Sequence, residues 1–279
     1  MERIFVLLRS PGSATAVLLG ATLIALIVAN SPLATQYMSL VNLKLGPLTT
    51  MEWVNDALMA IFFLFVGLEV KRELVSGELN TNAKRIMPGI AALFGVLVPA
   101  IIYYLIAGFS EVYVHGWAIP TATDIAFAIG VITALGSRVP NSMKVFLTAL
   151  AVIDDLIAII VIAIFYAANL NLFYLFAAVV VTGLLIYCNR SGYVRSLSYI
   201  ILGIILWYCI LRSGLHATMA GVILAMTIPE RGKIGRKYVR PMQHWEHYLS
   251  NWVSFVIVPI FAFFNAGVSL GGFGVADLT

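Results

Sequence analysis

The chain has 279 residues, of which 61% are hydrophobic and only 11% are charged. About a quarter of the residues in a soluble domain are charged, so this composition excludes a water-soluble globular protein and indicates an integral membrane protein. A formal net charge of +4 would also suit a nucleic-acid-binding protein, but the basic residues are distributed along the chain as in a membrane protein.

The apolar segments predict membrane-spanning helices rather than strands of a barrel. The runs 156–166 and 199–211 are long and uninterrupted, whereas a barrel strand alternates polar and apolar residues over about 10 positions. Residues 1–9 contain two arginines and are separated from the first long run by Pro11 and Gly12, so we expect an interfacial helix there. Cys188 and Cys209 are isolated in apolar runs and indicate neither a disulfide nor a metal site.

Windows of about 20 apolar residues, the length that crosses a bilayer, predict about nine spans in a single integral membrane domain covering residues 1–279. They lie near residues 13–30, 52–70, 86–107, 117–135, 144–168, 171–188, 197–212, 214–229 and 248–269. With a cytoplasmic amino terminus, only Lys44 and Arg212 of the 17 lysines and arginines lie on the opposite side. The positive-inside rule therefore predicts this orientation, with Thr279 outside.

Residues 117–124, with the sequence WAIPTATD, interrupt the fourth expected span. Pro120 removes a backbone donor and disturbs the preceding turn. Irregular backbone at membrane depth is tolerated only where it is buried or lines a cavity. A lone proline is typical of an ordinary kink, but here Thr121, Thr123 and Asp124 are close by, which favours a broken helix that lines a site.

Acidic residues lie within or at the ends of the expected spans, and a central aspartate costs roughly 2.5–3.5 kcal/mol on insertion scales. Asp56 and Glu69 are near span ends, where contact with water or with Arg72 explains them. Asp124, Asp154 and Asp155 lie deeper. Adjacent helical positions point about 100° apart, so one aspartate of the Asp154-Asp155 pair can face a cavity while the other meets a neighbouring helix.

Carboxylates held away from water suit competition between protons and a cation. Burial and nearby negative groups favour protonation of a carboxylate, whereas a bound hard cation stabilises its ionised form. The sequence therefore predicts a site for Na⁺ and H⁺ at Asp154 and Asp155, with Asp124 and the hydroxyls of Thr121 and Thr123 nearby. If two protons leave for each Na⁺ that binds, the exchange is electrogenic. Neither a cofactor nor a prosthetic group is indicated.

Several segments resemble the NhaA family of sodium/proton antiporters, for which inverted repeats and broken helices are established features. The resemblance runs in order along almost the whole chain. It is carried by WVNDALMAIFFLFVGLEVKREL (53–74), GWAIPTATDIAFAIGV (116–131), KVFLTALAVIDDLIAIIVIAIFY (144–166), LRSGLHATMAGV (211–222) and PIFAFFNAGVSL (259–270).

The resemblance implies an all-α polytopic bundle in a bacterial inner membrane, commonly dimeric, that exchanges cytoplasmic Na⁺ or Li⁺ for external protons. It assigns ion and proton binding to Asp154 and above all Asp155. Asp124 and Thr123 match the family's first broken helix, which contributes to charge balance and ion access. Positions associated with the pH response are matched by Glu69, Arg72, Glu73, Glu246 and His247, and also by His216.

The family has about twelve spans, an inverted counterpart of the broken helix, and a later lysine that pairs with the first aspartate of the pair. No lysine follows Lys237 here, so we expect a fragment of a longer protein or a natural truncation.

Other classes remain as alternatives. A non-transporting scaffold or inactive fragment would tolerate Asp155→Asn. A channel is less favoured because buried proton-binding pairs suit an exchanger. An intramembrane aspartyl protease needs two facing carboxylates that share a proton, and such enzymes resemble a pattern with glycine-x-glycine before one aspartate and tyrosine before the other. This chain has Ala-Thr-Asp and Val-Ile-Asp-Asp instead.

Overall fold

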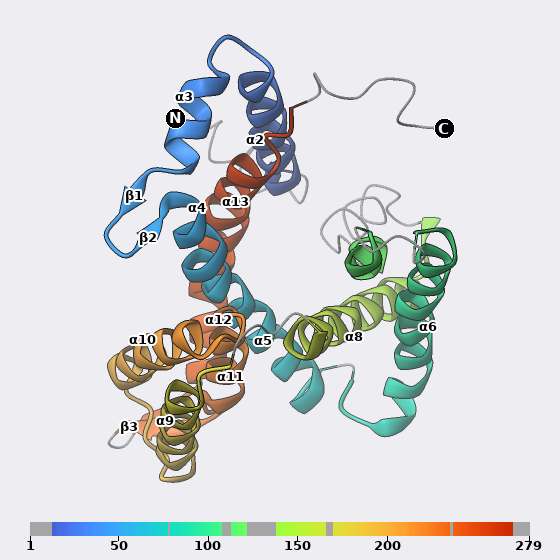
Figure 1. Cartoon of the computed structure of the whole chain (residues 1–279). Coiled ribbons are helices and arrows are strands. Elements are labelled where there is room, and N and C mark those ends of the chain that lie inside the picture. Colours follow the sequence, from blue (N-terminus) through green and yellow to red (C-terminus); the bar gives the residue numbers. More distant parts are fainter. Residues whose placement is uncertain are drawn as a thin grey trace, which may run out of the picture. The chain divides into compact units, whose positions relative to one another are not determined.

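The computed structural model describes residues 13–77, 79–107, 113–121, 138–165, 170–234 and 237–269. Helices dominate them, as the apolar composition predicts (Figure 1). The helices are α2 (Ser13–Ala29), α3 (Ala34–Val41), α4 (Thr50–Glu52), η1 (Trp53–Leu58), α5 (Met59–Val75), α6 (Asn82–Ala107), η2 (Val114–Thr121), α8 (Asn141–Phe165), α9 (Leu172–Arg190), α10 (Ser196–Ser213), α11 (Met219–Thr227), α12 (Pro241–Trp252), η4 (Val253–Ile257) and α13 (Val258–Asn265). Two short antiparallel hairpins pair β1 (Lys44–Leu45) with β2 (Leu48–Thr49) and β3 (Gly232–Ile234) with β4 (Lys237–Val239).

The chain divides into two compact units. Unit 1 combines Met1–Phe62 with His247–Thr279, and unit 2 is Phe63–Glu246. The division falls within α5 and within α12, so each of these helices contributes to both units. The two units are described separately below.

In unit 1, α2 packs against α13, although the two helices come from opposite ends of the chain (Figure 1). The side-chain amide of Asn30 donates to the carbonyl of Val268 at 2.9 Å, and the Tyr37 hydroxyl donates to the carbonyl of Phe263 at 2.7 Å. The Asn265 amide donates to the side-chain oxygen of Asn55 at 2.8 Å. These bonds satisfy polar groups that would otherwise be costly in an apolar environment.

Two departures from regular α-helix occur in this unit. The axes of α2 and α3 are bent by 118°, so the apolar run that begins at Ser13 turns sharply rather than continuing. The segments η1 and η4 are π-helical, and π-bulges are rare and frequently occur at functional sites. Asp56 lies within η1.

In unit 2, α9, α10 and α11 form a tightly packed group. A β-carbon added to Gly203 of α10 would lie 2.6 Å from the side chain of Leu224 in α11. One added to Gly67 of α5 would lie 2.7 Å from the β-carbon of Ala225. Both separations are shorter than a van der Waals contact, so glycine allows α11 to approach its neighbours on two sides.

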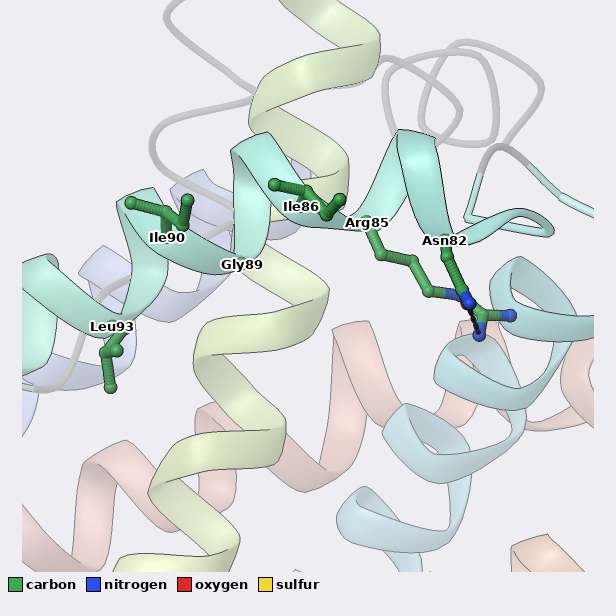
Figure 2. Close-up of a pocket in the computed structure, with 6 residues that line it drawn as sticks. All are labelled: Asn82, Arg85, Ile86, Gly89, Ile90 and Leu93. Carbon is green, nitrogen blue, oxygen red and sulfur yellow. Dashed lines mark hydrogen bonds between the residues drawn. The ribbon is translucent and has the colours of Figure 1, made fainter.

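The other part of unit 2 contains α6, α8 and η2, and α6 packs against both α8 and η2. A shallow groove of about 390 Å³ runs along α6 and is lined by Asn82, Arg85, Ile86, Gly89, Ile90 and Leu93 (Figure 2). None of the described residues that line it carries a carboxylate, and Ile86, Ile90 and Leu93 are exposed. The groove therefore suits contact with lipid chains rather than ion binding. Arg85 extends from it to donate to the carbonyl of Leu74 at 3.0 Å.

Most of the expected spans coincide with helices. Five continuous helical segments of the described residues are long and apolar enough to cross a membrane, or six if the bent α2–α3 pair counts as one span. They are Thr50–Val75, Asn82–Ala107, Leu172–Arg190, Ser196–Ser213 and Pro241–Asn265. The last begins seven residues before the expected span because the polar start of α12 continues the helix beyond the apolar window.

The expected span 214–229 contains only the nine residues of α11, which at 1.5 Å per residue cover about 13.5 Å. This helix alone is too short to cross about 30 Å of hydrocarbon. The expected interfacial helix at residues 1–9 and most of the expected span 117–135 lie outside the described residues.

Candidate ion site and charged cluster

Asp154 is buried in the middle of α8, with only 4% of its surface exposed. Ala151, three residues earlier, is buried as well, and residues three apart lie on the same face of a helix. Asp154 therefore belongs to the packed face of α8 in an otherwise apolar stretch. Next to it, Ile153 reaches within 4.0 Å of the position that a β-carbon would take on Gly89 of α6.

Asp155 follows Asp154 in the same helix, so its backbone is helical. Its side chain lies outside the described part of the structure, as do Thr123 and Asp124 altogether. Helical geometry directs the two aspartates about 100° apart. Consequently, the two positions of the pair lie on different faces of α8.

The predicted break in the fourth span has a structural counterpart in η2. Residues 114–121 form a 3₁₀-helix that contains Pro120, and 3₁₀ segments are usually short. Gly116 lies directly against the Tyr103 hydroxyl, which donates to the Tyr113 carbonyl at 2.8 Å. Thr121 is buried and its hydroxyl donates to the Ala118 carbonyl at 2.7 Å. The backbone thus departs from α-helical geometry just before Thr123 and Asp124.

A second set of charges surrounds Arg72 near the end of α5. One guanidinium nitrogen, Nη2, lies 2.9 Å from a carboxylate oxygen of Glu73 and 3.9 Å from one of Glu69. The other, Nη1, lies 3.2 Å from a carboxylate oxygen of Glu246 in α12. The side chains of Glu73 and Glu246 are largely buried, and those of Arg72 and Glu69 are about a third exposed. We call these four residues the Arg72 cluster.

His216 and His247 do not belong to the Arg72 cluster. His247 follows Glu246 in α12 and is exposed, because the next position on a helix points in a different direction. His216 is exposed in the connection between α10 and α11. It precedes α11, whereas Lys71, the neighbour of Arg72, binds the opposite end of the same helix. About 13.5 Å of helix therefore separates His216 from Lys71.

Lys71 was not singled out by sequence reasoning. Its ammonium group donates to the carbonyls of Met226 at 2.7 Å and of Ile228 at 2.5 Å, with the Ala225 carbonyl at 3.4 Å. Asn189 of α9 donates to the neighbouring Thr227 carbonyl. A cation at a helix carboxyl end is favourable because of the unpaired carbonyls and the helix dipole. No pattern near Lys71 could reveal this role, since its partners are backbone atoms far along the chain.

Comparisons with known proteins agree with these observations. A family model described as Na⁺/H⁺ antiporter 1 matches residues 6–279. A protein of Mesorhizobium japonicum named Na(+)/H(+) antiporter NhaA is 54% identical over 265 residues, which cover 94% of this chain and 67% of that protein. Proteins of the same name from Rhizobium etli and Caulobacter vibrioides are each 49% identical, covering 98% and 95% of this chain and 70% and 65% of their own lengths. The chain thus spans about two thirds of the length of these relatives.

Proposed function

Because the chain belongs to the NhaA family of sodium/proton antiporters, we propose that its Asp154-Asp155 pair binds Na⁺ and protons in competition. The chain is a bacterial multi-pass membrane protein, and its family transports ions rather than catalysing a reaction. Na⁺ and H⁺ are the ions that the family exchanges, and the exchange needs no cofactor.

The burial of Asp154 within α8 is the observation that carries this proposal. Burial makes the ionised form of a carboxylate costly, and binding of a proton or a cation offsets that cost. A bound proton or a bound cation each compensates the negative charge of the carboxylate. The carboxylate does not bind both well at the same time. Exchange follows if the occupied site opens to one side of the membrane at a time.

We assign a supporting role to the break after η2. Thr123 and Asp124 would contribute to charge balance and ion access, as the resemblance implies. The 3₁₀ geometry up to Thr121 supports this assignment, because irregular backbone at membrane depth frees carbonyl oxygens for a ligand. A hard cation prefers such oxygen ligands.

The most direct test replaces each aspartate of the pair by asparagine, which preserves size and removes the charge. Sealed vesicles that hold the protein are given a sodium gradient, and the resulting pH change is followed. We expect Asp155→Asn to abolish exchange while membrane insertion is retained, and Asp154→Asn to impair it. Glu230→Gln is the matched control, because it removes a carboxylate from a loop between α11 and α12.

Exchange that persists in Asp155→Asn would overturn the assignment of the site, whereas no exchange even in the unchanged sequence would favour a non-transporting scaffold or an inactive fragment. Because the chain spans about two thirds of its relatives' length, each variant is measured twice. One series uses the chain itself, and the other uses a form extended at the carboxyl end by the remaining part of a relative. Activity in the extended series alone would show that the pair needs residues beyond Thr279.

Exchange of two protons for one Na⁺ would make transport electrogenic. The excess of carboxylates over the single charge of the cation supports this stoichiometry. The test imposes a membrane potential on the same vesicles with a potassium gradient and valinomycin. The rate should change with the potential, and a rate that does not respond would exclude this stoichiometry.

Transport of Li⁺, a homodimeric state, an inner-membrane location and a cytoplasmic amino terminus belong to the same proposal. The distribution of lysine and arginine supports the orientation. Accessibility of an engineered cysteine at residue 233 to a membrane-impermeant reagent, in intact and in opened cells, tests it. Li⁺-driven pH changes test the transport of Li⁺, and the mass of the purified protein in detergent tests the homodimeric state.

We also propose that the Arg72 cluster sets the pH response. Three carboxylates surround one guanidinium, so the charge of the cluster changes as protons bind. The cluster links α5 with α12, and a change in its charge would alter the attraction between these helices. His216 and His247 are weaker candidates because both side chains are exposed and neither belongs to the Arg72 cluster.

A further inference from the structure

The connection between α11 and α12 carries a high density of positive charge. Residues 229–240 contain five basic side chains and a single acidic one, Glu230, which gives a net charge of +4. The whole chain has the same net charge of +4. The basic residues are Arg231, Lys233, Arg236, Lys237 and Arg240.

The β3–β4 hairpin places the side chains of this segment on two opposite faces. Lys233 pairs with Tyr238 and Gly232 pairs with Val239 across the strands. Cross-strand partners lie on the same face, and residues two apart along a strand share it. Arg231 and Arg240 flank the strands two residues from Lys233 and Tyr238, so these four side chains share one face. All four are exposed, Arg231 to 71% and Tyr238 to 79%.

The opposite face of the hairpin, which contains Gly232, packs against the rest of unit 2. A β-carbon on Gly232 would lie 2.1 Å from Cγ1 of Val194, which is itself only 6% exposed. The backbone of β3 therefore lies directly on the α9–α10 connection, where only glycine fits. Because this side is occupied, the hairpin cannot turn its basic face inward.

Three features suit the basic face to a lipid surface. The hairpin follows α11 closely, and Arg240 immediately precedes the span Pro241–Asn265. The backbone amide of Met242 donates to the Pro229 carbonyl at 3.3 Å, which ties the two ends of the segment together. An exposed aromatic ring beside cations is typical of residues at the membrane interface, and the ammonium of Lys233 lies 4.7 Å from the centre of the Tyr238 ring.

We propose that the exposed face formed by Arg231, Lys233, Tyr238 and Arg240 binds the phosphate headgroups of anionic lipids in the adjoining leaflet. Basic clusters next to a membrane span attract anionic lipids over a distance of about 8 Å at physiological ionic strength. Glu230 lies 3.4 Å from Arg231 and offsets part of its charge. Lys233 and Arg240 therefore contribute most of the attraction.

The test measures lipid selectivity in reconstituted membranes. The protein is placed in phosphatidylcholine bilayers with trace spin-labelled phosphatidylglycerol or spin-labelled phosphatidylcholine, and the fraction of immobilised label gives the preference for the anionic lipid. The test variant combines Arg231→Gln, Lys233→Gln and Arg240→Gln. The control variant combines Lys44→Gln, Lys84→Gln and Arg138→Gln, which removes the same charge from exposed positions elsewhere.

We expect the preference of the hairpin variant for phosphatidylglycerol to fall by about fivefold or more, the effect of at least one basic residue at an anionic surface. The control should keep most of its preference, and binding of phosphatidylcholine should not change in either variant. An equal loss in both variants would overturn the proposal, since general charge would then account for the preference. Displacement of the labelled lipid by millimolar inorganic phosphate would also overturn it, because a free anion would then be the ligand.

Circular dichroism of both variants establishes that the helices are intact. If the hairpin variant unfolds, the single variants Lys233→Gln and Arg240→Gln replace it, and each should lower the preference. Wild-type preference in both would contradict the proposal. These measurements do not depend on transport, so they are independent of the proposed exchange.

Discussion

Arg72 Nη1 and Glu246 Oε1 lie 3.2 Å apart and join the end of α5 to the start of α12. Arg72 also contacts Glu73 and Glu69 of its own helix. The contact with Glu246 is thus the only one of these three ion pairs that connects different helices. Its strength depends on how many of the three carboxylates are ionised.

Replacing Arg72 by glutamine should displace the pH profile of exchange toward alkaline pH. Loss of the guanidinium removes a charge that favours the ionised forms of Glu69 and Glu246, so these two keep their protons to higher pH. The measurement is the initial rate of sodium-driven exchange in vesicles from pH 6 to pH 9. Arg72→Lys retains a charge and should shift the profile less, although lysine cannot reproduce the two-sided contact of the guanidinium. A profile unchanged in Arg72→Gln would exclude the Arg72 cluster from the pH response.

Glu246→Gln should displace the same profile in the opposite direction. Loss of the Glu246 charge removes a repulsion that disfavours ionisation of Glu69, so Glu69 ionises at lower pH. The adjacent change His247→Gln is the matched control, because this side chain is exposed and does not belong to the Arg72 cluster. A larger shift in His247→Gln than in Glu246→Gln would show that the histidine, and not the ion pair, carries the response.

Lys71→Met should destabilise the protein by about 1.5–3 kcal/mol, the range for hydrogen bonds to a charged group. The carbonyls at the carboxyl end of α11 would lose their charged donor. Thermal unfolding in detergent measures the effect, with Lys84→Met as the exposed control. Lys71→Arg should recover most of the stability because it keeps a cation at the helix end. Equal stability of Lys71→Met and the wild type would show that Asn189 alone is sufficient to stabilise the carboxyl end of α11.

Gly67→Ala should destabilise the folded protein by about 1–3 kcal/mol, the usual cost of overpacking. The new methyl group would lie 2.7 Å from the β-carbon of Ala225. The double variant with Ala225→Gly should recover much of the loss, because the two changes act on one contact. Gly95→Ala in α6 is the control, as nothing lies within 4 Å of its added carbon. This control should be neutral or stabilising by up to about 1 kcal/mol, from helix propensity. Additive effects of Gly67→Ala and Ala225→Gly would contradict the close approach.

Several features of the candidate site were accessible from the sequence. Asp154 lies in a largely apolar run, and its side chain is buried in α8. Pro120 and the nearby threonines predicted an irregular segment, and η2 is a 3₁₀-helix there. The contact between Glu69 and Arg72 follows from helical spacing, because residues three apart share a face, whereas Glu73 was named only through the family resemblance. The role of Glu246 came only from the family resemblance.

Other features could not be read from local patterns. The apolar run beginning at Ser13 gave no sign that α2 and α3 are bent by 118°, and the apolar residues 214–229 predicted a longer helix than α11. A hydropathy window sums the apolar character of the side chains and contains no information on the direction of the backbone. It therefore detects that a segment is apolar but not where the backbone turns.

The sequence by itself determined the membrane class, the helical architecture and the family, because composition, apolar run length and motif identity are local properties of the chain. Only the tertiary structure decided which distant groups meet. It brought Glu246 to Arg72, the ammonium of Lys71 to the carbonyls that end α11, and the backbone of Gly232 to Val194. Such contacts depend on how helices pack, and packing is set by the shapes of all neighbouring side chains together rather than by any one segment.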